Sequence, residues 1–120
     1  MTVKDLQARI QVFAEERDWE KFHSPKNLIM ALTGEVGELS EIFQWMDQAQ
    51  AAAVMSNPDS AQSVREELAD VFWYLLRLAD VLHVDLEDAA LAKIEINRTR
   101  YPADQVRGSA VKYTRLGPTS

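Results

Sequence analysis

Apolar side chains recur at three- and four-residue intervals over most of the chain, which is the period of an amphipathic α-helix. Four stretches show this period, at about residues 3–19, 25–46, 63–82 and 85–101. The third stretch could equally begin one turn earlier, near Asp59. No stretch alternates with the two-residue period of a β-strand. The pattern therefore predicts an all-α fold.

Turn and capping residues set the expected boundaries of these helices. Ser24-Pro25 is typical of a helix start, because Ser caps free N–H groups and Pro suits the first turn. The Asn, Pro, Asp and Ser residues before the third helix predict a loop over residues 48–63. Pro102 should end the fourth helix. We expect a helical domain over residues 1–102 and an extended tail over residues 103–120.

Two pairs of acidic residues occupy matching positions in the second and third helices. Glu35 and Glu38 form one pair, and Glu67 and Asp70 form the other. Residues three apart share a helical face, so each helix presents two carboxylates beside its apolar stripe. On the third helix, Tyr74 and Arg77 continue the same edge. If the two helices face each other, four carboxylates meet, which is costly unless a cation lies among them.

A lone acidic pair on a helix is usually solvated surface, but three features argue against that interpretation here. The pairs flank apolar stripes, they occur in matching frames, and Lys93 and Asn97 fall on the expected inward face of the fourth helix. Carboxylates without Cys or a nearby His suit Mg²⁺ or Mn²⁺ better than Zn²⁺. Such ions complete their coordination with substrate phosphates. The residues thus favour a magnesium site for phosphorylated substrates, at which any of the four carboxylates could activate water.

Composition narrows the class of protein. A chain of 120 residues with 47% apolar and 27% charged residues is typical of one globular domain. The absence of cysteine excludes disulfides and thiol chemistry. The N-terminus shows no signal peptide and no apolar run reaches the about 18 residues of a membrane span, so we expect a cytoplasmic protein without a membrane partner.

The charge balance changes along the chain. The net charge of −6 argues against nucleic-acid binding. Residues 1–92 carry 7 Lys and Arg against 17 Asp and Glu, a balance of −10, whereas residues 93–120 carry 6 against 2, a balance of +4. The basic final segment could supply phosphate-binding cations, or it could be a solvated tail.

The sequence resembles the MazG-type all-α nucleoside triphosphate pyrophosphatases, and among them the dCTP pyrophosphatase branch. The similar segments are Phe13–His23, Gly34–Leu39, Phe43–Trp45, Glu66–Asp70, Lys93–Pro102 and Lys112–Thr114. The resemblance implies a four-helix MazG-like domain that packs into an oligomeric bundle, as a dimer or a tetramer whose sites borrow from more than one subunit. It also implies a Mg²⁺-dependent hydrolase that converts a nucleoside triphosphate, dCTP or a modified dCTP, to the monophosphate and pyrophosphate.

The resemblance assigns roles to particular residues. It implies metal ligands at Glu35, Glu38, Glu67 and Asp70, and these also form the catalytic set. It implies base-pocket roles for Trp19, His23 and Trp45. It implies contacts to sugar or phosphate from Tyr74, Lys93, Asn97 and Tyr101.

Two other interpretations fit parts of the pattern. A non-catalytic helical module could bind nucleotides or partner helices through the same groove, since a chain this short cannot bury its long amphipathic helices alone. A di-iron bundle also uses inward carboxylates, but its motif is Glu-x-x-His. No His stands three residues after Glu35 or Glu67, so this interpretation ranks third.

Overall fold

The computed structural model describes residues 1–116, and every regular element within them is helical. The α-helices are α1 (Val3–Glu16), α2 (Pro25–Phe43), α3 (Gln48–Ala52), α4 (Pro58–Val81), α5 (Leu86–Arg100) and α6 (Ala103–Val106). The 3₁₀ segments are η1 (Glu20–Phe22), η2 (Val54–Ser56) and η3 (Tyr113–Arg115). The predicted all-α fold is confirmed. None of the described helices combines the length and apolarity needed to cross a membrane.

The predicted loop over residues 48–63 is wrong, because the turn residues there cap helices. Asp47 accepts a hydrogen bond from the Gln50 amide at 2.8 Å, and the Gln50 side chain accepts one from the Asp47 amide at 2.9 Å. This capping box starts α3. Asn57 accepts from the Asp59 amide at 2.9 Å, and Pro58 occupies the first turn of α4. Helix α4 therefore begins near the earlier of the two predicted starts.

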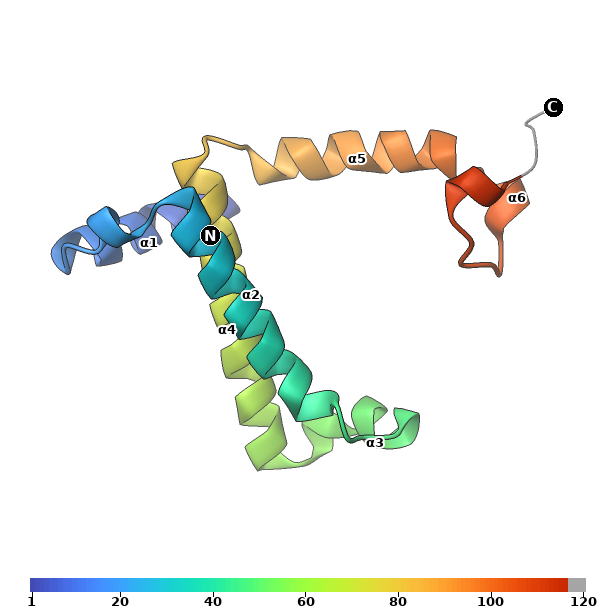
Figure 1. Ribbon diagram of the computed structural model, residues 1–120, viewed down its shortest axis with the longest axis horizontal. Helices are drawn as coiled ribbons and strands as arrows, with labels where there is room; N and C mark the ends of the chain where they lie inside the picture. The colour runs from blue at the N-terminus through green and yellow to red at the C-terminus, as the bar shows by residue number, and fades with distance from the viewer. Residues whose placement is uncertain (117–120) are drawn as a thin grey trace. The chain divides into compact units, whose positions relative to one another are not determined.

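The chain forms two compact units, which we describe separately. The first, Met1–Val84, is built on an antiparallel pair, α2 and α4, which lie side by side, with α1 packed against α4 (Figure 1). Its core contains Ile10, Ala14, Leu28, Val54, Ala61, Val64, Leu76 and Ala79. The Gln7 side chain ties α1 to α4 by donating to the Leu76 carbonyl oxygen at 3.0 Å.

The second unit begins at Asp85, which caps α5 by accepting from the Asp88 amide at 3.0 Å. Helix α5 thus groups with the segments that follow it. The tail predicted to be extended contains α6 and η3, so that prediction is wrong for these segments; residues 117–120 lie outside the described range. The domain boundary after residue 102 stays a prediction.

The apolar stripes of α2 and α4 are less buried than their periodicity predicts. Val36 is 48% exposed and Leu68 is 52% exposed, although both were expected in the core. The aromatic side chains of Phe22 and Phe72 are exposed as well. The reason is geometric, because the two helices cover each other along one strip only and α1 covers part of α4. The first unit therefore carries a wide apolar surface.

Two residues after the end of each of helices α1 and α4 stands a non-glycine residue with left-handed backbone. His83 has φ 58°, and the following Val84 amide donates to the Ala79 carbonyl oxygen at 2.8 Å. Asp18 has φ 54°, and the Trp19 amide donates to the Ala14 carbonyl oxygen at 2.9 Å. These hydrogen bonds, each between residues five positions apart, define Schellman-type helix ends. Such ends favour glycine, because a Cβ strains left-handed backbone.

Replacing His83 by Gly should therefore stabilise the protein by about 0.5–1 kcal/mol, since relief of strain exceeds the added freedom of the unfolded chain. Thermal denaturation followed by circular dichroism measures the effect. His83→Ala is the matched control, because it removes the imidazole but keeps the Cβ. An equal gain from both variants would place the effect in the imidazole and contradict the prediction.

Candidate active site

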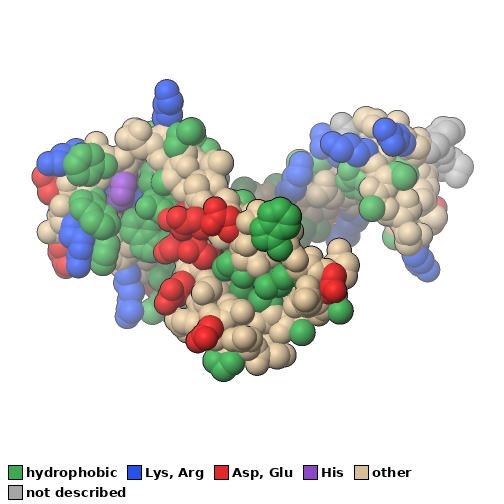
Figure 2. All heavy atoms as spheres, turned by 60° about the horizontal axis from the view of Figure 1, so that its bottom comes forward, with side chains coloured by type: hydrophobic (Ala, Val, Ile, Leu, Met, Phe, Trp, Pro, Cys, Tyr) green, Lys and Arg blue, Asp and Glu red, His purple; other side chains and the backbone are tan. Residues whose placement is uncertain are grey.

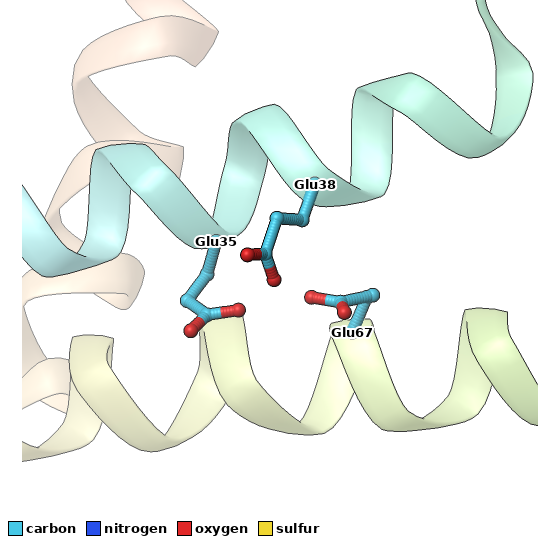
Figure 3. Close-up of side chains that lie close together, drawn as sticks. All are labelled: Glu35, Glu38 and Glu67. Atoms are coloured by element: carbon cyan, nitrogen blue, oxygen red, sulfur yellow. The ribbon is translucent and has the colours of Figure 1, made fainter.

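Three carboxylates from two helices converge on one space between them. Helix α2 supplies Glu35 and Glu38, α4 supplies Glu67, and their side chains point toward one another (Figure 3). One oxygen from each lies within 4.8 Å of the others. The predicted meeting of the two acidic pairs is thus realised for three of the four residues. Asp70, nearly one turn beyond Glu67 on α4, lies outside this group and lines the adjoining cavity.

The cluster is electrostatically unfavourable as it stands. Oε2 of Glu35 and Oε2 of Glu67 are both buried without a hydrogen-bond partner. Burial, in the first place, and the close approach of the Glu67, Glu38 and Asp70 carboxylates raise the pKa of Glu35 to about 7. Burial is also the main cause that raises the pKa of Glu67. Folding therefore brings together carboxylates whose ionised forms are destabilised, so that they bind protons more readily than free carboxylates do.

A divalent cation fits this arrangement. Buried, unpartnered carboxylate oxygens are unusual in folded proteins and call for a specific explanation. Three carboxylates within reach of one point supply the hard oxygen ligands that such ions prefer. Glu35, Glu38 and Glu67 are the residues that would hold the ion, and the ion would offset the burial and the repulsion that raise the pKa of Glu35.

An aromatic cavity of about 220 Å³ adjoins the carboxylates. Its walls are Phe13, Trp19, Glu35, Asp70, Trp73 and Tyr74. Figure 2 shows acidic side chains gathered beside hydrophobic ones on one face of the first unit. Burial and the charges of Glu35 and Asp70 raise the pKa of Tyr74, which keeps its hydroxyl a hydrogen-bond donor. The cavity can hold a flat apolar ring at one end and charged groups at the other.

The aromatic rings around the cavity contact one another edge to face. Phe13 lies 5.6 Å from Trp19 and 6.3 Å from Trp73, measured between ring centroids. His23 does not line the cavity but lies behind it, 6.5 Å from Trp19 and 5.8 Å from Trp73. Such edge-to-face pairs fix ring orientation. The walls are therefore held in place by the side chains behind them.

Sequence reasoning missed Trp73 and Phe13 as cavity residues. Trp73 stands three positions after Asp70 on α4, so the helical spacing that paired the acids also places the indole on their face. Phe13 carried no comparable signal, because its position depends on how α1 packs against α4.

Trp45, another predicted site residue, lies apart from this cavity. Trp45 follows the end of α2, is 89% exposed and lines a different cavity of about 510 Å³. Trp19 and Trp45 therefore do not share a cavity within one chain. Lys93, Asn97 and Tyr101 belong to the second unit, where Lys93 is exposed and Asn97 is half-buried. Their roles toward substrate stay predictions.

In this all-α protein, carboxylates from two helices lie beside an aromatic cavity. This arrangement suits a cation together with an organic ligand. The chain belongs to the MazG-like family, which matches residues 31–116. It is 49% identical over 115 residues to dCTP pyrophosphatase 1 of Rattus norvegicus and 48% identical over 115 residues to dCTP pyrophosphatase 1 of Homo sapiens. Each alignment covers 96% of this chain and 68% of the relative.

A solved structure of a pyrophosphatase is also similar to this chain. The crystal structure of a pyrophosphatase from Archaeoglobus fulgidus superposes with a TM-score of 0.77 at 38% sequence identity, covering 82% of this chain and 91% of that one. The resemblance to MazG-type pyrophosphatases inferred from the sequence motifs is confirmed.

Proposed function

We propose that this protein is a Mg²⁺-dependent nucleoside triphosphate pyrophosphohydrolase that converts dCTP or a modified dCTP to the monophosphate and pyrophosphate. The observation that carries the proposal is the placement of the Glu35, Glu38 and Glu67 carboxylates directly beside the aromatic cavity. A phosphate group is repelled by such carboxylates unless a cation lies between them. A nucleobase stacks on flat apolar side chains such as those of the cavity. The names of the relatives support the same reaction.

The residues of the site have different roles in the proposed hydrolysis. Water adds to the α-phosphorus, the bond from that phosphorus to the oxygen bridging to the β-phosphate breaks, and pyrophosphate leaves. Glu35, Glu38 and Glu67 would hold Mg²⁺, which would neutralise charge on the phosphates and lower the pKa of water. Asp70 lines the cavity together with Glu35. The four carboxylates are the candidates to accept the proton of water.

The cavity supports a nucleobase. Its volume of about 220 Å³ is below the ~300–1,000 Å³ of pockets that hold drug-sized ligands, which suits one planar base. Trp19 and Trp73 supply faces and edges for stacking, and the Tyr74 hydroxyl can donate to the sugar or a phosphate. Exposed Trp45 and the exposed apolar side chains of α4 support an oligomeric enzyme.

A panel of nucleoside triphosphates tests the proposal directly. The purified protein is incubated with Mg²⁺ and each triphosphate, and the products are resolved by chromatography. We expect dCMP and pyrophosphate from dCTP, slower turnover of purine substrates, and no products with excess EDTA. Failure to form a monophosphate from any triphosphate would sink the proposal. Nucleotide binding in calorimetry without hydrolysis would instead favour the non-catalytic module.

A further inference from the structure

Arg77 is a charged side chain buried in the first unit, with 4% of its surface exposed. Its Nε donates to Nδ1 of His23 at 3.0 Å, and its Nη1 donates to Oε1 of Gln11. Its carboxylate partner is Asp80, at 3.7 Å and 40% exposed. A buried charge is costly unless it is well paired, and two of the three groups that contact this guanidinium, His23 and Gln11, are neutral acceptors. Such an arrangement needs an explanation beyond stability.

The hydrogen bond from Arg77 determines the chemical state of His23. Arginine does not lose its proton in proteins, so its Nε is always a donor. The Nδ1 atom that accepts this bond must be unprotonated, which leaves the imidazole neutral with its proton on Nε2. Burial and the Arg77 charge lower the pKa of His23, against the opposing effect of Glu20. Among the described residues, Nε2 of His23 makes no hydrogen bond.

His23 connects Arg77 to the cavity walls. Its ring meets the rings of Trp19 and Trp73 at 71° and 76°, in edge-on contacts. Trp73 and Arg77 are four residues apart on α4, so the arginine and the indole share a helical face. Gln11, which accepts from Arg77, lies on α1 together with Phe13. One guanidinium therefore links α1, α4 and the segment that carries His23 and Trp19.

We propose that Arg77 is a positioning residue of the nucleotide pocket, which fixes His23 as the neutral Nε2–H tautomer and through it holds Trp19 and Trp73 at the cavity. The role of Arg77 toward substrate rests on the proposed function, whereas the tautomer does not.

Nuclear magnetic resonance of the full chain tests the tautomer. Long-range ¹H–¹⁵N spectra at neutral pH should show His23 protonated on Nε2 alone. Arg77→Met, which keeps the volume but removes the donor, should give a mixture of tautomers, and Arg77→Lys should restore part of the wild-type signal. Arg65→Met, an exposed change on the same helix, is the control and should leave the signal intact. A wild-type His23 protonated on Nδ1, or a tautomer unchanged in Arg77→Met, would overturn the proposal.

A double-mutant cycle tests whether Arg77 acts through His23. Arg77→Met should raise the KM for dCTP about three- to tenfold, the range of one lost hydrogen bond, with little change in kcat. His23→Phe, which keeps the ring contacts but accepts no hydrogen bond, should do the same. The double variant should match the single variants, whereas multiplied effects would mean a general structural role and refute the proposal. If the wild-type protein does not hydrolyse dCTP, the proposed function fails, and the tautomer measurement still decides the state of His23.

Discussion

Replacing Glu35 by Gln is expected to abolish hydrolysis of the triphosphate and, at the same time, to stabilise the metal-free protein. The carboxylate is one of three that would hold the cation, so turnover should fall by about 10²–10³-fold or more. The buried Oε2 atom and its acidic neighbours make the ionised side chain unfavourable for folding. A neutral amide of the same shape removes that repulsion and can donate to Glu38 or Glu67.

Two measurements on the same samples separate these effects. Hydrolysis of dCTP with Mg²⁺ reports the loss of function, and thermal denaturation in EDTA at about pH 8 reports the gain in stability, which we expect at about 1–2 kcal/mol after solvent screening is taken into account. Glu41→Gln is the matched control, because Glu41 is an exposed acid further along the same helix. Turnover near the wild-type rate in Glu35→Gln would show that the cluster is ordinary surface charge. Lower stability would show that the carboxylates do not repel one another.

Helical spacing explains why much of this site could be predicted from the sequence. The relative direction of two side chains three residues apart is set by the helix alone, so Glu35 and Glu38 had to share a face. The same logic places Glu67 and Asp70 together on α4. That the two pairs meet followed from their common relation to the apolar stripes. The close approach of Glu35, Glu38 and Glu67 confirms this inference for three of the four residues, and Asp70 lies outside the group.

Local signals were less reliable where one residue type serves two purposes. Asn57 and Pro58 are typical of turns, but the same side chain and ring that form a turn also start a helix. The predicted loop over residues 48–63 therefore missed α3, and of the two predicted starts for the third helix the one near Asp59 agrees with the start of α4. His83 shows the converse, because its left-handed backbone ends α4 without the glycine that usually marks such an end.

Burial could not be predicted from periodicity, because it depends on what covers each face. Leu68 follows the apolar period of α4 but is 52% exposed, whereas Arg77, a charged residue, is 4% exposed. Arg77 was expected on the edge shared with Tyr74, and its hydrogen bond to His23 crosses 54 positions of sequence. Contacts of this kind arise from the packing of α1 against α4, which no spacing within one helix encodes.

The stability of the metal-free protein should fall as the pH rises from about 4.5 to about 7, and a divalent cation should reverse that fall. Glu35 has a pKa of about 7 in the folded chain against an ordinary value of 4.5, so in this interval the folded state binds more protons than the unfolded state. Stability therefore decreases with pH and levels off above the folded pKa. A shift of this size corresponds to at most about 3 kcal/mol, which solvent around the partly exposed cluster reduces to about 1–2 kcal/mol.

Cations and protons compete for the same oxygens, so the two effects are linked. Mg²⁺ should raise the Tm more at about pH 8 than at about pH 5, because at the lower pH the ion must first displace protons. Glu35→Gln should flatten both the pH dependence and the response to Mg²⁺, whereas Glu41→Gln should preserve them. Equal stabilisation by Mg²⁺ at both pH values, or an unchanged pH dependence in Glu35→Gln, would contradict the prediction. The expected outcome would mean that the folded protein tolerates the repulsion among Glu35, Glu38 and Glu67, and that binding of the cation removes it.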